Sequence, residues 1–269
     1  MRRLLIRPGA IGDCILAFPA MESLDAAYTE VWVPSAVVPL VRFADRVRAI
    51  AGTGLDLLGI EDRQPPEALI AALRGFDSIV SWYGENRPEF REGALAVTPN
   101  WTFLKALPPD GCGLPATDFF AGQIGATAGL SPRIAVQRLV MHGATVIHPF
   151  SGSRKKNWPL ERFQELAARL DGPVKWLAGP EDVLAGADRF EDLGELADWL
   201  AGARVYVGND SGITHLAAAV GIPTVALFGP TDPKVWGSRG ERVRCVREEP
   251  ISDLTVERVL EAAREAVGT

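Results

Sequence analysis

Cysteine is scarce in this chain of 269 residues. Cys14, Cys112 and Cys245 match no metal-binding or redox spacing, and three cysteines cannot all pair within one chain. We therefore expect reduced thiols and a cytoplasmic protein. No apolar run approaches the roughly 18 to 20 residues of a membrane span, and Arg7 and Pro8 interrupt the opening run too early for a signal peptide. A formal net charge of −6 argues against a general nucleic-acid binder.

Short apolar runs alternate with amphipathic segments of helical length along the whole chain. This alternation predicts parallel sheets covered by helices. The expected strands are 3–7, 30–33, 47–51, 77–82, 94–98, 144–148, 173–178, 204–207 and 223–228. The expected helices are 13–27, 65–74, 116–129, 159–170, 181–187, 192–201, 212–220 and 254–267.

Residues 130–143 separate two such β/α series and carry Pro132 and scattered charge. We therefore expect an α/β protein of two Rossmann-like domains, residues 1–134 and 135–269, whose parallel sheets face a cleft. Ligands of such sheets bind beyond the carboxyl ends of the strands. The polar segments that follow strands are thus the candidate site.

The stretch Y-V-G-N-D-S-G-I-T-H, residues 206–215, runs from a strand into a helix. The first turn of a helix has unpaired N–H groups and a partial positive charge, so Asp210, Ser211 and Gly212 begin a ready anion site that suits a diphosphate. His215, one turn later, can add a hydrogen bond. The alternative is that Asp210 or Ser211 merely caps the helix.

A strongly cationic loop, S-G-S-R-K-K, follows the strand that ends at His148. Core packing does not explain Arg154, Lys155 and Lys156 at the carboxyl end of a strand. They either form a solvated surface run or clamp a diphosphate leaving group, with the hydroxyls of Ser151 and Ser153 as further donors.

The opening turn R-P-G-A-I-G-D, residues 7–13, has only part of the glycine pattern of a dinucleotide-binding loop. Asp13 would repel a phosphate at the helix start. Its carboxylate either caps the helix or accepts a proton at the domain cleft.

Three blocks in order, R-P-G-A-I-G-D, H-P-F-S-G-S-R-K-K-N-W-P-L-E-R-F at 148–163 and V-G-N-D-S-G-I-T-H-L-A-A-A-V-G-I-P-T-V-A-L-F-G-P-T-D-P at 207–233, carry a resemblance. The sequence resembles glycosyltransferase family 9, the ADP-heptose:lipopolysaccharide heptosyltransferases and their relatives. The resemblance implies a GT-B fold, with the sugar donor bound by the second domain and the acceptor by the first. It also implies that the last helix, about 254–267, crosses back to pack on the first domain.

The resemblance assigns a role to each matching position. Asp13 is the base that deprotonates the acceptor hydroxyl, and Lys156 contacts the donor diphosphate. Glu181 binds the ribose, and Asp210 contacts the donor sugar. The remaining positions are the phosphate-holding Ser151, Ser153, Ser211, Gly212 and His215, and the acceptor-side turn glycines Gly9 and Gly12.

The implied activity is inverting, metal-independent transfer of heptose from an ADP donor to a lipopolysaccharide-core or other glycan acceptor. No cofactor and no metal site are expected, since no Asp-x-Asp pair occurs. We expect a monomer with no nucleic-acid partner and at most peripheral contact with the inner face of the bacterial inner membrane. The alternatives are another donor sugar, a non-lipopolysaccharide acceptor, or a nucleotide-sugar-binding protein without catalysis. A Rossmann oxidoreductase is disfavoured by the incomplete glycine pattern.

The chain departs from the family in three ways. Pro8 stands where leucine is common, the chain is short, and no dense basic patch is evident for a phosphorylated acceptor. Arg87, Arg91 and Lys105 are the candidates for such a patch, with solvated surface as the alternative.

Overall fold

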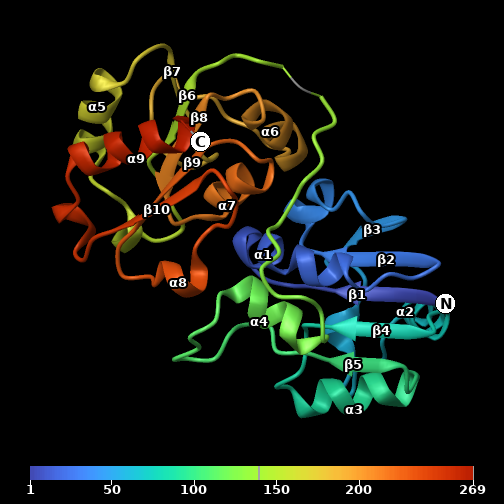
Figure 1. Ribbon diagram of the computed structural model, residues 1–269. Helices are drawn as coiled ribbons and strands as arrows, with labels where there is room; N and C mark the ends of the chain where they lie inside the picture. The colour runs from blue at the N-terminus through green and yellow to red at the C-terminus, as the bar shows by residue number, and fades with distance from the viewer. Residues whose placement is uncertain (139, 269) are drawn as a thin grey trace.

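A computed structural model describes residues 1–138 and 140–268 and contains two five-stranded parallel sheets (Figure 1). The first has the strand order β3-β2-β1-β4-β5. Its strands are β1 (Arg2–Ile6), β2 (Tyr28–Val33), β3 (Arg46–Ala49), β4 (Ser78–Ser81) and β5 (Trp101–Phe103). Its helical segments are α1 (Ile11–Glu22), η1 (Ser35–Leu40), η2 (Leu55–Leu57), α2 (Glu67–Arg74), α3 (Pro88–Val97) and α4 (Ala116–Gln123).

The second sheet has the order β10-β9-β8-β6-β7. Its strands are β6 (Thr145–His148), β7 (Val174–Trp176), β8 (Val205–Asn209), β9 (Thr224–Phe228) and β10 (Val243–Arg247). Its helical segments are η3 (Arg154–Lys156), α5 (Leu160–Arg169), α6 (Leu193–Leu200), α7 (Gly212–Ala219), α8 (Pro233–Trp236), η4 (Ile251–Asp253) and α9 (Val256–Gly268). The expected domain boundary at 134/135 falls between α4 and β6, in the stretch that connects the two halves.

Helices α1 and α7 join the two halves. The apolar face of α1, which includes Phe18 and Met21, shares one buried cluster with Leu216 and Ala219 of α7. Each half has a further core of its own: one is built around Trp32 and Phe90, the other around Trp158. The first turns of α1 and α7 therefore meet at the carboxyl edges of both sheets.

Two local expectations are wrong. Residues 94–97 are not a strand but the end of α3, because Phe90 and Ala94 bury one helical face while Leu95 stays 45% exposed. Residues 181–187 form turns instead of a helix, since Val183 is 92% exposed and leaves no apolar face. Arg189 binds the carbonyls of Gly179, Asp182 and Leu184, and those of Asp182 and Leu184 lie where the helix was expected.

The expected position of the last helix is also wrong. Helix α9 packs on the second sheet and α5, not on the first half (Figure 1). Val256, Val259, Leu260 and Ala263 of its apolar face lie in one cluster with Val207 and Leu227 of the second sheet. This apolar face is buried within its own half, so packing against the first half would bury no further apolar surface of the helix.

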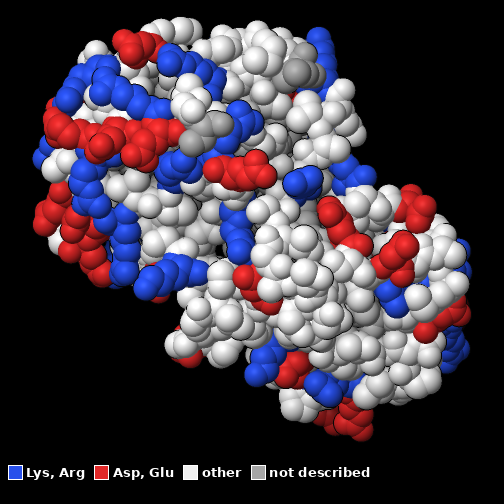
Figure 2. Space-filling model, viewed as in Figure 1, with Lys and Arg blue, Asp and Glu red and all other residues white. Residues whose placement is uncertain are grey.

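Charge is unevenly spread over the surface. Figure 2 shows Lys, Arg, Asp and Glu side chains crowded over α5, α9 and β10, whereas the surface over α4 and the loop before it is mostly uncharged. Within residues 1–138 and 140–268, no helix has both the length and the apolar character needed to cross a bilayer.

Candidate active site

A cavity of about 1030 Å³ opens between the two halves at the carboxyl ends of β1, β6 and β8. Both sheets reverse their strand order here, since β1 lies between β2 and β4 and β6 lies between β7 and β8. Such switch points are where open α/β sheets bind ligands. The predicted site residues in the lining are Gly12, Asp13, Ser151, Ser153, Lys156, Glu181, Asp210, Ser211, Gly212 and His215.

The first turn of α7 points into this cavity and is rigidly held. Ser211 is its N-cap, and its hydroxyl accepts a hydrogen bond from the Thr214 N–H at 3.3 Å. The Thr214 hydroxyl contacts the Asn209 carbonyl at 2.5 Å and the Tyr206 hydroxyl at 3.1 Å. Ser211 therefore caps the helix, as one of the two interpretations predicted. Capping uses the Thr214 N–H and leaves other N–H groups of the first turn for an anion, so the two interpretations are compatible.

Asn209 ties the α7 turn to the cationic loop. Its side-chain oxygen accepts from the Trp158 N–H at 2.9 Å, and its amide donates to the Pro149 carbonyl at 2.8 Å. The two predicted motifs therefore form one rigid unit.

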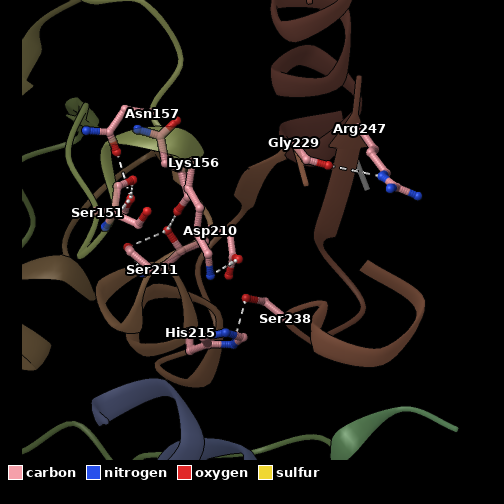
Figure 3. Close-up of polar contacts among 12 residues, drawn as sticks. Ser151, Lys156, Asn157, Asp210, Ser211, His215, Gly229, Ser238 and Arg247 are labelled. Atoms are coloured by element: carbon pink, nitrogen blue, oxygen red, sulfur yellow. Dashed lines mark hydrogen bonds and ion pairs between the residues drawn. The ribbon is translucent and has the colours of Figure 1, made fainter. Parts of the chain in front are cut away.

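Lys156 and Asp210 face each other across this unit (Figure 3). The Lys156 ammonium donates to Asp210 Oδ2 at 2.7 Å, with the Asp210 side chain 6% exposed and that of Lys156 33% exposed. Arg154 and Lys155 are exposed outside the lining, so Lys156 is the member of the cationic run that faces the cavity.

The hydroxyl of Ser151 is already engaged within its own loop. It donates toward Asn157 Oδ1 at 2.7 Å and lies 2.9 Å from the Ser153 carbonyl (Figure 3). Ser151 therefore shapes the loop that lines the cavity.

Asp13 lies in the first turn of α1, on the opposite wall. Its Oδ2 accepts from the Ala10 N–H at 3.2 Å, so it also caps the helix start. Gly9, with φ of +125°, turns the chain beneath it, and an added Cβ there would lie 3.2 Å from the Asp13 Cβ. Arg7, 1% exposed, donates to the Asp13 carbonyl at 2.8 Å and lies over the Phe120 ring. This buried arginine, which the sequence did not single out, fixes the backbone that carries Asp13.

Glycines allow the first turns of α1 and α7 to touch. A Cβ on Gly12 would lie 2.7 Å from the His215 ring, and one on Gly212 would lie 2.8 Å from the Ile11 Cβ. His215 is buried, and its Nδ1 pairs with the Ser238 hydroxyl at 3.0 Å (Figure 3). Burial lowers the pKa of His215; Asp210 and Asp13 oppose this effect and Lys156 adds to it, so the ring is neutral at pH 7.

His148 is a second buried histidine of the lining and ends β6. Its Nδ1 pairs with the Tyr206 hydroxyl at 3.2 Å. Burial lowers its pKa to about 4, with Asp182 opposing, so it is also neutral at pH 7. Glu181, the predicted ribose-binding acid, is an exposed side chain at the cavity edge.

The chain matches the family model of glycosyltransferase family 9 (heptosyltransferase) over residues 126–262, just over half of its length. It is 36% identical over 115 residues to lipopolysaccharide heptosyltransferase 1 of Pseudomonas aeruginosa, a match that covers 37% of this chain and 30% of that protein. The chain spans about a third of the length of the heptosyltransferase 1 relatives it matches.

Solved structures show the same fold. A family 9 glycosyl transferase from Veillonella parvula aligns with a TM-score of 0.75 at 17% identity, covering 99% of this chain and 97% of that one. Heptosyltransferase WaaC of E. coli, solved with ADP, aligns with a TM-score of 0.71 at 19% identity, covering 99% and 100%. The predicted GT-B fold and the family resemblance are both confirmed: this chain belongs to glycosyltransferase family 9.

Proposed function

We propose that this protein is an inverting glycosyltransferase that moves heptose from an ADP-linked donor to a glycan of the lipopolysaccharide-core type. One observation carries the proposal: the three sequence motifs, up to 200 residues apart, converge on one cavity that joins an anion-binding helix start to a carboxylate. The family membership and the P. aeruginosa relative support the choice of heptose.

The donor diphosphate binds at the first turn of α7, where Ser211 and Gly212 offer backbone N–H groups. Lys156, held by Asp210 at 2.7 Å, neutralises the departing charge. Asp210 contacts the donor sugar, the Ser151–Ser153 loop lies along the phosphates, and Glu181 meets the ribose. His215 is neutral and donates or accepts a hydrogen bond without adding charge.

Chemistry takes place between the two walls. The acceptor oxygen attacks the anomeric carbon from the side of Asp13, and the bond from that carbon to the phosphate oxygen breaks. The acceptor proton passes to the Asp13 carboxylate, and ADP leaves with the electron pair. A single displacement of this kind inverts the anomeric configuration.

Charge neutralisation by Lys156 and the α7 helix start makes the proposed reaction metal-independent. Transfer should therefore survive EDTA and show no requirement for added Mg²⁺. A rate that collapses with EDTA and returns with Mg²⁺ would contradict this part of the proposal.

A donor comparison tests the function as a whole. Calorimetric titration with ADP, UDP and GDP should give tight binding for ADP, and incubation with ADP-heptose and core glycans should release ADP and yield a heptosylated product by mass spectrometry. Binding of ADP with no transfer to any glycan would favour a nucleotide-sugar-binding protein without catalysis. Preference for UDP or GDP would indicate another donor sugar.

A further inference from the structure

The two ring nitrogens of His215 have different surroundings. Nδ1 lies 3.0 Å from the hydroxyl of Ser238, a buried residue of the loop between α8 and β10 (Figure 3). Ser238 is outside the cavity lining, whereas His215 and Gly12 belong to it. An added Cβ on Gly12 would lie 3.4 Å from the His215 Nε2. The Nε2 edge of the ring is therefore the one that lies on the cavity side.

The hydroxyl of Ser238 decides where the hydrogen of the imidazole sits. The ring is neutral at pH 7 because burial lowers the pKa of His215, so one nitrogen carries a hydrogen and the other a lone pair. The hydrogen bond made by one nitrogen sets the protonation of the other.

Two arrangements of this pair are possible, and only one satisfies the serine. Within residues 1–138 and 140–268, the Ser238 hydroxyl has His215 Nδ1 as its hydrogen-bond partner and no other. If Nδ1 donated, the O–H of the serine would have no acceptor, and an unpaired buried donor is destabilising. Donation from Ser238 to Nδ1 satisfies both groups and leaves the hydrogen on Nε2.

The loop that carries Ser238 is held on both sides. The Gly237 N–H donates to the Pro233 carbonyl at 2.9 Å. On the other side, Arg239 reaches α4 of the first half, where its guanidinium donates to Asp118 Oδ1 at 2.5 Å. This ion pair is partly shielded from solvent. These contacts keep the serine hydroxyl in place against the ring.

We propose that Ser238 is a positioning residue of the donor site: its hydroxyl donates to Nδ1 of His215 and so fixes the tautomer whose Nε2–H donates to the donor diphosphate. This rests on the proposed function, in which the diphosphate binds at the first turn of α7. The oxygens of an ionised diphosphate accept hydrogen bonds, so the opposite tautomer would turn a lone pair toward them. The serine thereby lets a neutral histidine recognise an anion.

NMR measures the tautomer directly. The chain has three histidines, and the ring signals of His215 are identified by their loss in His215→Gln. Long-range ¹H–¹⁵N spectra of the full chain at pH 7, without ligand, should show Nε2 protonated and Nδ1 as a hydrogen-bonded acceptor. In Ser238→Ala the Nδ1 resonance should move to the position of a free acceptor, and Ser238→Thr, which keeps the hydroxyl, should restore it. A hydrogen on Nδ1 in the unmodified protein overturns the proposal.

Two ligands that differ in their phosphates separate positioning from general structural damage. ADP and adenosine are each titrated against the full chain by NMR. Ser238→Ala should weaken ADP binding about tenfold and leave adenosine binding within about twofold, because the ring faces the diphosphate. Ser238→Thr should bind ADP within about twofold of the unmodified protein. Equal losses for ADP and adenosine, or no loss for ADP, would contradict the proposal.

A second serine of the same half serves as the matched control. Ser252 is exposed, and its hydroxyl contacts only its neighbour Asp253 among the described residues. Ser252→Ala should change neither the His215 resonances nor the affinity for either ligand.

Failure of the two proposals can be told apart. If the unmodified protein does not bind ADP, the proposed function fails and this assignment fails with it. If the protein binds ADP and transfers heptose while Ser238→Ala keeps full ADP affinity, the function stands and only the Ser238 assignment falls.

Discussion

Asp13 combines two tasks in one carboxylate, since its Oδ2 caps the start of α1 while the side chain lines the cavity. Asp13→Asn keeps an oxygen for the Ala10 N–H but removes the proposed base. We expect kcat to fall by about 10² to 10⁴. Calorimetry should show ADP affinity within twofold of the unmodified protein. Near-normal transfer by the variant would exclude Asp13 as the base.

Lys156 and its neighbour offer a matched pair of substitutions. Lys156→Ala removes the ammonium that Asp210 holds in the cavity, so both ADP affinity and kcat should fall by at least tenfold. Lys155→Ala removes the same charge from an exposed position outside the lining and should leave both within twofold. The measurements are calorimetry with ADP and the transfer assay. Equal effects of the two substitutions would mean that general positive charge, and not the Lys156 position, matters.

The site residues that the sequence predicted share one property: each lies in the segment that follows the carboxyl end of a strand. Asp13 follows β1, Lys156 follows β6 and Asp210 follows β8, so strand order and local polarity were enough to find them. Leu107 escaped notice because the folded chain brings it to the cavity from a loop with no local signal. Ser238 escaped notice for the same reason, since it reaches His215 from a distant loop. The buried Arg7 was visible in the sequence but looked like an ordinary charged residue at the end of a strand.

At the scale of elements, the contact between α1 and α7 depends on two glycines. Gly12→Ala puts a methyl group 2.7 Å from the His215 ring, so we expect a loss of stability of about 1 to 3 kcal/mol and weaker ADP binding. Gly122→Ala, in an open part of α4, should instead stabilise by roughly 0.5 to 1 kcal/mol. Urea unfolding measures both. Changes of opposite sign in the free energy of unfolding would support the α1–α7 contact. A stabilising Gly12→Ala would contradict it.

The burial of His148 makes the second sheet sensitive to acid, because it lowers the pKa of the imidazole. The folded pKa of about 4 lies below the ordinary value of 6.5, so the unfolded chain binds more protons between these pH values. The free energy of unfolding should therefore fall as the pH drops from about 6.5 to about 4, by up to roughly 3 kcal/mol from this group. Urea unfolding at pH 7 and pH 5 measures the effect.

His148→Gln is the control, since glutamine can pair with Tyr206 but does not titrate. It should lose most of that pH dependence and keep only the part due to other groups, including His215. If the free energy of unfolding of His148→Gln fell with pH as steeply as that of the unmodified protein, His148 would not be the responsible group.

Most strands and helices were predictable from periodicity because parallel strands are buried on both faces and read as short apolar runs. The expected strand at 94–98 failed because a short run of alanine, leucine and valine reads the same way in a strand and at the end of a helix. Helices α3 and α8 and strands β5 and β10 were not predicted. Strand β10 lies at a sheet edge, is largely not buried and carries Arg244 and Arg247, so its pattern is weak.

At the scale of the molecule, Arg42 fastens the two halves together. Its guanidinium binds Asp198 of α6 at 3.1 Å and also the carbonyl of Ala135. Asp198 further accepts from the Gln137 and Arg138 N–H groups at 2.9 and 3.0 Å. The side chains of Arg42 and Asp198 are 9% and 17% exposed, so this pair is better shielded than a surface ion pair.

Arg42→Met should lower the free energy of unfolding by about 2 kcal/mol and raise the susceptibility of residues 130–138 to proteolysis. Arg169→Met breaks an exposed ion pair with Glu257 within one half and should change neither. Thermal unfolding and limited trypsin digestion measure these outcomes. If Arg42→Met changed thermal unfolding and trypsin digestion as little as Arg169→Met, the Arg42–Asp198 pair would not hold the halves together.

The two-sheet architecture was predictable from the sequence, because each β/α series indicates one parallel sheet and the family resemblance implies the GT-B fold. The position of the last helix did not follow, since an apolar helical face specifies that it is buried but not against what. Ala263 and Val259 could have packed against either half. In the structure they pack on the apolar face of β8, β9 and β10 beside α5.

Because α9 stays with the second sheet, the described chain passes between its halves once, in the stretch between α4 and β6. A single splice in that stretch is therefore enough to exchange one half for that of another family member. Such a hybrid must preserve the α1–α7 contact, the residues around Arg42 and Asp198, and the contact of Arg239 with Asp118 of α4. The half proposed to bind the donor and the half proposed to bind the acceptor should therefore be separately exchangeable.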